Sequence, residues 1–195
     1  MQLTQNEFDK FICNALPKRK RGPEGKVPRL KIFNYILKLV YTGCQWKELP
    51  IDKDETGKSE ISPSRVFRIF KRWLNSGVFE KVFGHSIQLL FEEGRLDISI
   101  IHGDGTTTAA KKGGDNIGRN GHKKMTGEKV VCFVDRLCNV LSPFTTAPGN
   151  ASEMTLMPKA LQDLKSFVKK IGMSLKGTIA SFDSGYDSKA NRKKI

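Results

Sequence analysis

The sequence has few cysteines, and their arrangement does not match a metal site. Only four of the 195 residues are cysteines, and no two of them form a Cys-x-x-Cys pair. No histidine stands at zinc-ligand spacing from them, so a zinc site is not expected. We expect Cys13, Cys44, Cys132 and Cys138 to be reduced, buried thiols.

Long apolar runs are also absent. No stretch approaches the ~20 consecutive apolar residues that a membrane-spanning helix needs. The chain begins with the polar stretch MQLTQNEFDKF, which lacks the apolar core of a secretory signal. Hydrophobic residues make up 38% and charged residues 28% of the chain, as in globular proteins. We therefore expect a soluble, cytoplasmic protein with no membrane partner.

Acidic residues are scarce relative to basic ones: 20 Asp and Glu stand against 34 Lys and Arg, for a net charge of +14. Such an excess destabilises a compact fold by self-repulsion and indicates a polyanionic partner, nucleic acid before a membrane surface. An ordinary solvated basic surface is the alternative. The basic residues form three groups: Lys18, Arg19, Lys20 and Arg21, followed by Lys26, Arg29 and Lys31; Lys111, Lys112, Arg119, Lys123 and Lys124; and Lys189, Arg192, Lys193 and Lys194.

The first half of the chain has helical periodicity. Thr4 and Glu7 form a capping-box pattern, Gly43 is a typical helix stop, and Ser62-Pro63 is a typical helix start. These signals predict helices over residues 4–15, 29–42, 63–75 and 78–91.

Two of these helices carry apolar faces, and one also carries a row of arginines. The expected core positions are Leu30, Phe33, Leu37, Val40 and Tyr41 in helix 29–42, and Val66, Phe70, Trp73 and Leu74 in helix 63–75. Arg65, Arg68 and Arg72 share one stripe of helix 63–75 because their spacing is i, i+3 and i+7. The stripe is either a solvated face or a DNA-contacting face, and the neighbouring basic arm favours DNA.

The second half of the chain favours strands. We expect a strand over 96–107, an antiparallel hairpin of 130–134 and 140–144 around a turn at 135–139, a helix over 155–171 and a strand over 178–182. A glycine-rich basic loop is expected over 111–126. This order suits a ribonuclease-H-like sheet, although other α+β folds remain open.

Two aspartates follow apolar stretches in this half. We expect Asp104, in ISIIHGDGTTT, and Asp183, in TIASFDSGYDS, at the ends of strands. Two such carboxylates on neighbouring strands would suit Mg²⁺, which prefers hard oxygen ligands. The alternative is that each is a turn former, since Asp-Gly and Asp-Ser-Gly are common turn sequences. His102 is expected on the same strand face as Asp104.

The basic loop also leaves two interpretations open. It is either a flexible hairpin connection or a segment whose backbone approaches a phosphate that Arg119, Lys123 and Lys124 neutralise. It is not a P-loop, because no Gly-Lys-Ser/Thr follows a glycine frame of the required length.

Several motifs together resemble a known family. The helical half contains TGCQWKELP, then RW, then GVFE; the second half contains HGDGTTTAAKKGG, NIGRNGHK, PGNASE and DSGYDS. These stretches resemble bacterial insertion-sequence transposases of the DDE class, in the group typified by insertion sequence five. The likeness covers nearly the whole chain.

The resemblance implies a fold and an activity. It implies an α+β chain with a helical DNA-binding domain over 1–94 and an incomplete ribonuclease-H-like catalytic domain over 95–195. Asp104 and Asp183 would be the first two catalytic acids and would bind Mg²⁺ or Mn²⁺, with Lys123 or Lys124 near the DNA. The partner would be double-stranded DNA with terminal inverted repeats. A homodimer is one option for the oligomeric state.

The sequence departs from the family at one essential position. The family's third acid, a glutamate on a helix after the second aspartate, has no counterpart up to Ile195. We therefore expect either one piece of a transposase, completed by a second reading frame or by omitted residues, or a catalytically dead DNA-binding fragment that acts as a repressor or is a relic. A basic RNA-binding protein is the third alternative.

Overall fold

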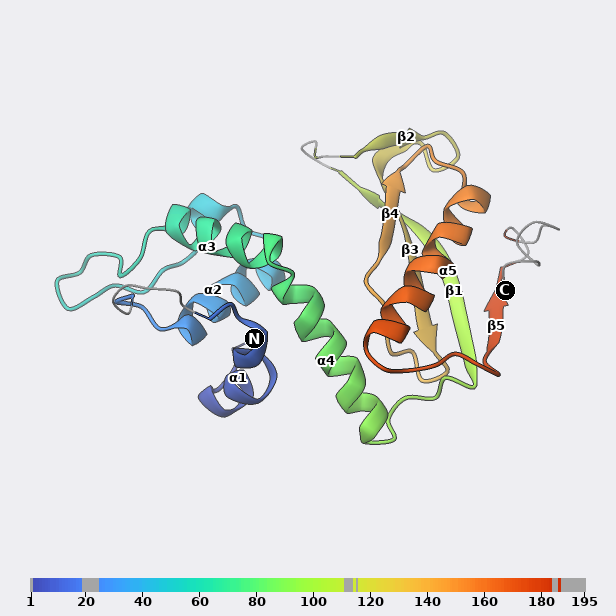
Figure 1. Cartoon of the computed structure of the whole chain (residues 1–195). Coiled ribbons are helices and arrows are strands. Elements are labelled where there is room, and N and C mark those ends of the chain that lie inside the picture. Colours follow the sequence, from blue (N-terminus) through green and yellow to red (C-terminus); the bar gives the residue numbers. More distant parts are fainter. Residues whose placement is uncertain (1, 19–24, 111–113, 115, 184–185, 187–195) are drawn as a thin grey trace. The chain divides into compact units, whose positions relative to one another are not determined.

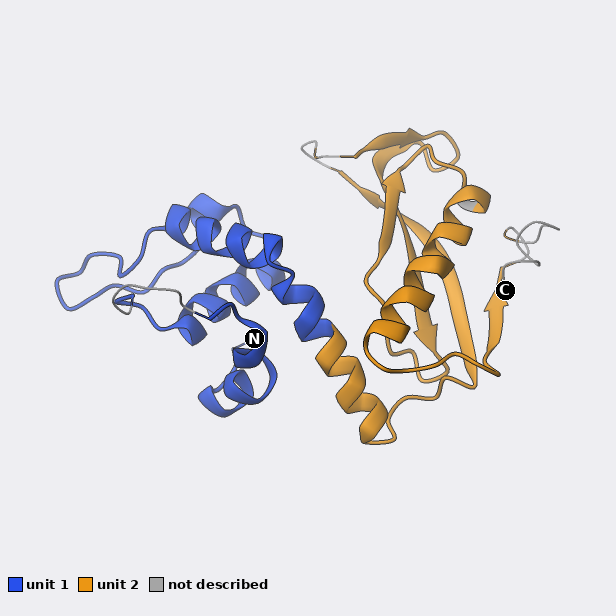
Figure 2. Ribbon diagram, in the orientation of Figure 1, with its two compact units in different colours: residues 1–83 blue, residues 84–195 orange. Residues whose placement is uncertain are grey.

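The computed structural model describes residues 2–18, 25–110, 114, 116–183 and 186 (Figure 1). The chain divides into two compact units, residues 1–83 and residues 84–195 (Figure 2). The division falls within helix α4, Val78–Glu92, whereas the sequence patterns placed the boundary near residue 94.

The first unit is helical, and local sequence signals fix its helix ends. Its elements are α1 Gln5–Phe11, η1 Cys13–Ala15, α2 Arg29–Thr42, η2 Trp46–Glu48, α3 Pro63–Asn75 and the start of α4. The Thr4–Glu7 capping box is present, and the Ser62 side chain accepts a hydrogen bond from the Arg65 amide. Gly43 ends α2 in the left-handed conformation, with φ of 65°, which glycine adopts without strain. The predicted helices are therefore confirmed, except that residues 13–15 form a separate 3₁₀ turn.

The core of the helical unit is formed mainly by α2 and α3. Buried apolar side chains include Phe8, Ile32, Phe33, Ile36, Val66 and Trp73. Three expected core residues, Val40, Tyr41 and Leu74, are instead exposed. Val40 and Tyr41 lie in the last turn of α2, past its buried segment, and Leu74 lies about 100° around the helix from the buried Trp73. Helical periodicity predicts which face of a helix is apolar. It does not predict how much of that face is covered by a neighbouring element.

The second unit contains one mixed sheet. Its strands are β1 Ile100–Ala109, β2 Gly118–Asn120, β3 Met125–Asp135, β4 Thr145–Pro148 and β5 Ile179–Phe182. Among the described residues the strand order is β2-β3-β1-β5, and β4 also pairs with β3. β1 is antiparallel to β3 and parallel to β5. The sheet is therefore mixed, with an antiparallel ladder between β1 and β3 and a parallel ladder between β1 and β5.

Helix α5, Glu153–Lys170, covers one face of this sheet (Figure 1). Leu161, Leu164 and Val168 of α5 belong to the same buried cluster as Ile101 and Phe133 of the strands. Burial alternates along β1 and β3, with Ile101, Val131 and Phe133 inward. Odd-numbered residues of these strands therefore face α5, and even-numbered residues face the opposite side.

Two details of the strand prediction are wrong. The segment predicted as the second hairpin strand, 140–144, forms only an isolated bridge between Val134 and Val140, and the strand itself is β4. The basic loop predicted over 111–126 contains β2 and the start of β3, which pair with each other. A segment rich in Gly, Lys and Asn has little intrinsic strand propensity, so β2 forms because it pairs with β3.

Two expectations from the sequence concern the burial of the cysteines and the absence of membrane-spanning helices. All four cysteines are free thiols; Cys13 and Cys138 are exposed and Cys44 and Cys132 are half-buried, so the expectation of buried thiols is wrong. No helix in the described ranges combines the length and apolar character needed to cross a membrane.

Candidate active site and nucleic-acid interface

The parallel pairing of β1 with β5 brings the two predicted catalytic aspartates together. The register runs from Ile100 opposite Ile179 to Gly103 opposite Phe182. Asp104 directly follows Gly103 and Asp183 directly follows Phe182, so the two aspartates come next on the two adjacent segments, and both are exposed. Adjacent strands lie ~4.8 Å apart, and directly paired residues project to the same face. The two residues are therefore neighbours, and their catalytic role stays a prediction.

Asp104 is not at the end of its strand, contrary to expectation. β1 continues to Ala109, and Asp104 pairs with Cys132 in the middle of the antiparallel ladder with β3. The parallel pairing of β1 with β5 ends at Gly103, so Asp104 lies just past the end of that pairing and not at the end of β1 itself. Strand alternation places Asp104 and His102 on the face opposite α5, which agrees with the expectation that they share a face.

The surroundings of Asp104 explain how its carboxylate is held. One of its oxygens, Oδ1, accepts a 2.7 Å hydrogen bond from the backbone N–H of Gly105. Burial, together with the negative charge of Asp104, raises the pKa of the Cys132 thiol opposite it. Cys132 is therefore a protonated, neutral neighbour of Asp104 at physiological pH.

Tyr186 ties the Asp183 segment to β1. Its backbone N–H donates to the Asp183 carbonyl at 3.0 Å, and its side chain is 4% exposed. The phenol oxygen occupies the space where a Cβ on Gly105 would stand. Sequence reasoning missed this contact. The sequence features that could have indicated this contact are a glycine directly after Asp104 and a tyrosine three residues after Asp183.

The donor chemistry of the two aspartates fits a hard divalent cation. Asp104 and Asp183 offer carboxylate oxygens on an exposed sheet face, and Mg²⁺ is commonly held by one or two carboxylates plus waters. No group of three His, Cys, Asp or Glu side chains that could hold a metal ion occurs among the residues that the structure describes. Two ligands from this chain are thus the most that these residues supply at one place.

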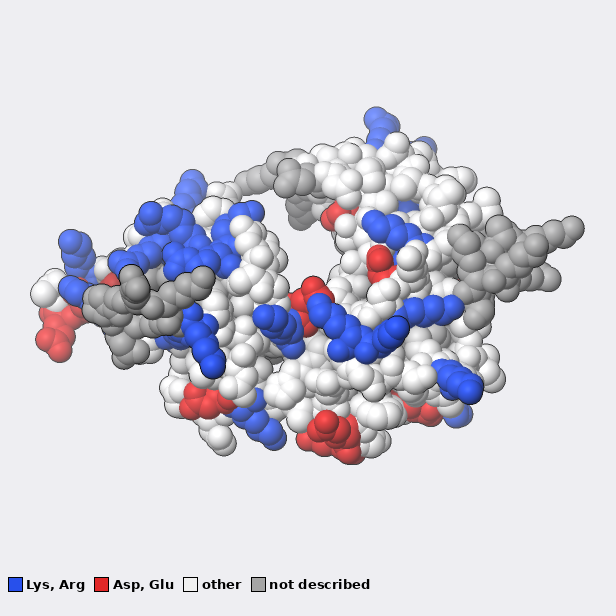
Figure 3. Space-filling view, viewed as in Figure 1, with Lys and Arg blue, Asp and Glu red and all other residues white. Residues whose placement is uncertain are grey.

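The predicted DNA-binding residues of the helical unit lie on its surface. Arg65, Arg68 and Arg72 are exposed, whereas Val66 and Trp73 on the other side of α3 are buried. Lys and Arg side chains gather over the part of this unit that carries α3 (Figure 3). Of the basic arm, Lys18 is exposed, while Arg19, Lys20 and Arg21 lie outside the described residues. The predicted arginine stripe is therefore accessible to a ligand.

The predicted basic residues of the sheet unit lie around the β2–β3 turn. Arg119, Lys123 and Lys124 are exposed, and the Lys123 N–H donates to the Asn120 Oδ1 at 3.0 Å. β3 begins at Met125, and the partner of Asp104 is Cys132, seven residues along. Seven residues of strand span about 23 Å. The structure therefore does not bring these lysines beside the two aspartates.

The comparisons with known proteins concern the helical unit. Residues 3–83 match a family described as "Putative transposase of IS4/5 family". No curated protein and no solved structure matches the chain. The family match confirms the resemblance to insertion-sequence transposases that the sequence motifs predicted.

Proposed function

We propose that residues 3–83, which match the IS4/5 transposase family, bind duplex DNA, and that the sheet unit provides two carboxylates of a DDE-type catalytic site. The observation that carries this proposal is the register of β1 and β5, because it makes neighbours of Asp104 and Asp183, 79 positions apart in the sequence. The family match supports a transposase and hence a DNA partner.

The sheet topology supports a ribonuclease-H-like assignment for the second unit. β1 is antiparallel to β3, and the chain then crosses through α5 to return as β5, parallel to β1. Such a crossover joins parallel strands within one sheet and covers one face with its helix. The other face carries Asp104 and is the proposed side for DNA.

The proposed chemistry is phosphodiester cleavage and transfer at the terminal inverted repeats. Asp104 and Asp183 would hold Mg²⁺ or Mn²⁺, which when bound stabilises charge on the attacking and leaving oxygens of a phosphoryl transfer. The exposed sheet face leaves room for a backbone phosphate beside the carboxylates. Arg65, Arg68 and Arg72 would position the duplex through its phosphates without reading sequence.

A substitution at the first aspartate tests the site. We expect Asp104→Asn to weaken Mn²⁺ binding by about tenfold, the effect of losing one charge-assisted ligand worth about 1.4 kcal/mol. Affinity for duplex DNA should be unchanged, since a two-ligand metal site is separate from the arginine stripe. Free Mn²⁺ measured by electron paramagnetic resonance and fluorescence anisotropy with labelled duplex give the two affinities.

The matched control is Glu92→Gln, which removes an exposed carboxylate of the same unit. It should leave both affinities as in the wild type. Equal Mn²⁺ binding by Asp104→Asn and wild type would exclude the proposed metal site. Loss of DNA binding would instead show that Asp104 has a structural role.

The arginine stripe gives a separate prediction about salt. Replacing Arg65, Arg68 and Arg72 by alanine should weaken duplex binding about tenfold and reduce the slope of log K against log salt by up to about 2.7, since each phosphate contact contributes about 0.9. Anisotropy titrations between low and moderate salt measure both quantities. Lys159, Lys169 and Lys176, exposed residues of the other unit, provide a control triple with the same loss of charge.

An equal effect of both triple variants would mean that net charge, and not the stripe, decides binding.

Strand cleavage distinguishes the enzyme from the catalytically dead fragment. We expect little or no cleavage of terminal-repeat DNA by this chain with Mg²⁺, because the described residues supply only two acids at one place. The binding-module alternative predicts repeat-specific binding with no metal effect at all.

A further inference from the structure

Helix α3 exposes about half of its circumference. Val66 and Trp73 mark its buried side, and at 3.6 residues per turn each residue is turned about 100° from the one before it. Ser64, Lys71 and Asn75 lie about 140–180° around the helix from Val66, and all three are exposed. These three residues form the outermost line of the helix, here called the outer row.

Two margins of different chemistry border the outer row. Arg65 and Arg72 lie about 100–120° from the buried side in one direction, and Arg68 lies between them and the outer row. Phe67 and Leu74 lie about 80–100° from the buried side in the other direction, where they are 38% and 46% exposed. The exposed half of α3 therefore has a cationic margin, a row of hydrogen-bonding side chains and an apolar margin.

The cations of α3 have no acidic partner within the part of the chain that the structure describes. Its four basic residues form no ion pair there, and the helix itself contains no acidic residue; they are Arg65, Arg68, Lys71 and Arg72. Arg68 is three and four positions from Lys71 and Arg72, a spacing at which like charges repel. Arg65 stands in the first turn, where the helix dipole disfavours a cation. Folding alone does not account for this arrangement, whereas a polyanionic partner does.

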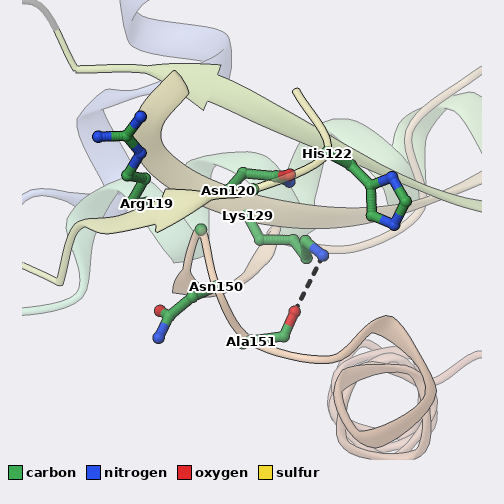
Figure 4. A pocket seen from close by; sticks show the side chains of 8 residues that line it. Arg119, Asn120, His122, Lys129, Asn150 and Ala151 are labelled. Atoms are coloured by element: carbon green, nitrogen blue, oxygen red, sulfur yellow. Dashed lines mark hydrogen bonds between the residues drawn. The ribbon is translucent and has the colours of Figure 1, made fainter. Parts of the chain in front are cut away.

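The basic side chains of the sheet unit are used differently. Lys129 lines a pocket of about 520 Å³ and is 7% exposed, and its ammonium group donates to the Ala151 carbonyl at 2.9 Å (Figure 4). Its charge serves contacts within the fold. The cations of α3 are instead exposed together on one helix, in the region where Figure 3 shows Lys and Arg side chains gathered.

The dimensions of α3 suit the major groove of duplex DNA. Its 13 residues rise ~1.5 Å each, so the helix is about 20 Å long, and a groove about 12 Å wide admits it. In such a position the margins of a helix face the phosphates, and its outermost side chains face the base edges. Lysine donates to guanine, asparagine pairs with adenine through two hydrogen bonds, and serine contacts either. An apolar margin suits the methyl group of thymine.

We propose that the outer row of α3 reads base edges in the major groove and gives the helical unit its DNA sequence preference. The arginines beside it hold the helix against the phosphates. This inference rests on the proposed function, because it requires that the helical unit binds duplex DNA. It extends that function by assigning Ser64, Lys71 and Asn75 as the residues that select the sequence.

Selection of duplexes from a randomised pool by the full chain, followed by sequencing, tests the proposal. The wild type should enrich a defined sequence, and anisotropy titrations then give its affinities for the selected duplex and for the unselected pool. Asn75→Ala should reduce the ratio of these affinities about tenfold and leave the pool affinity and the salt slope unchanged, because it removes no charge. Asn14→Ala, at an exposed asparagine of the same unit, is the matched control and should behave as the wild type.

Lys71 and Arg72 provide a second matched pair, because they are adjacent and carry the same charge. Lys71→Ala should lower the affinity for the selected duplex at least fivefold more than the affinity for the pool. Arg72→Ala should weaken both affinities to the same extent, as the loss of a phosphate contact does. Uniform weakening by both variants would overturn base reading by Lys71 and with it the outer row.

The remaining outcomes separate this inference from the proposed function. If the wild type binds the pool but enriches no sequence, base reading by α3 is excluded and DNA binding stands. An unchanged selected sequence and affinity ratio in Lys71→Ala and Asn75→Ala would equally exclude the outer row. Failure of the wild type to bind any duplex would overturn the proposed function as well.

Discussion

Asp135→Ala is expected to lower the free energy of unfolding of the sheet unit by about 3–5 kcal/mol. Asp135 is 0% exposed, and its carboxylate accepts hydrogen bonds from the backbone N–H groups of Asp97 at 2.8 Å, Leu137 at 3.0 Å and Asn139 at 2.7 Å. Alanine would leave these donors without their acceptor at the end of β3. Urea unfolding followed by circular dichroism measures the loss.

Asp104→Ala is the matched control, because it removes an exposed aspartate from the same sheet. Its effect on stability should stay within about 0.5 kcal/mol. Asp135→Asn, which keeps one carbonyl oxygen as acceptor, should fall between the two. A stability of Asp135→Ala equal to that of the wild type would mean that the turn after β3 is held by other contacts.

This comparison separates two kinds of aspartate that look alike in the sequence. Asp135 and Asp104 both follow apolar stretches, but the carboxylate of Asp135 accepts hydrogen bonds from surrounding backbone N–H groups and so has a structural role. The sequence marked Asp135 correctly as the start of a turn. It did not reveal that the carboxylate also fixes Asp97, 38 positions earlier, because that contact depends on how β1 and β3 pair.

The helix boundaries could be predicted because their causes are local. Ser62 and Pro63 at the start of α3, and Gly43 at the end of α2, act on their own backbone within a few residues. The strands were harder to predict for the opposite reason. β2 is a three-residue strand whose partner lies across a turn, and residues 140–144 are apolar enough for a strand although β4 begins only at Thr145.

The candidate site was predictable in its residues but not in its geometry. The family motifs pointed to Asp104 and Asp183, and apolar runs before them indicated strands. Their proximity depends on a parallel register set by the crossover through α5, which no local pattern encodes. The burial of Lys129 in β3 was not predicted, since a lysine among valines gives no sign that it will be buried.

The second large effect is expected at Gly105, where β1 meets Tyr186. A Cβ at this position would overlap the phenol oxygen of Tyr186, so Gly105→Ala should destabilise the sheet unit by about 2–3 kcal/mol or displace the tyrosine. Because the Tyr186 N–H is bonded to the Asp183 carbonyl, displacement would also move Asp183 away from Asp104. Mn²⁺ affinity should then fall together with stability.

Tyr186→Phe provides the compensating change, because it removes the oxygen that the new methyl group would meet. In a double-mutant cycle, Gly105→Ala with Tyr186→Phe should recover about 1–2 kcal/mol of the stability lost by Gly105→Ala alone. Recovery of Mn²⁺ affinity in the double variant would show that the tyrosine positions Asp183, since a purely structural role would restore stability only. Additive effects of the two substitutions would mean that the phenol oxygen and Gly105 are not in contact, and that Asp183 is held next to Asp104 by the β5 register alone.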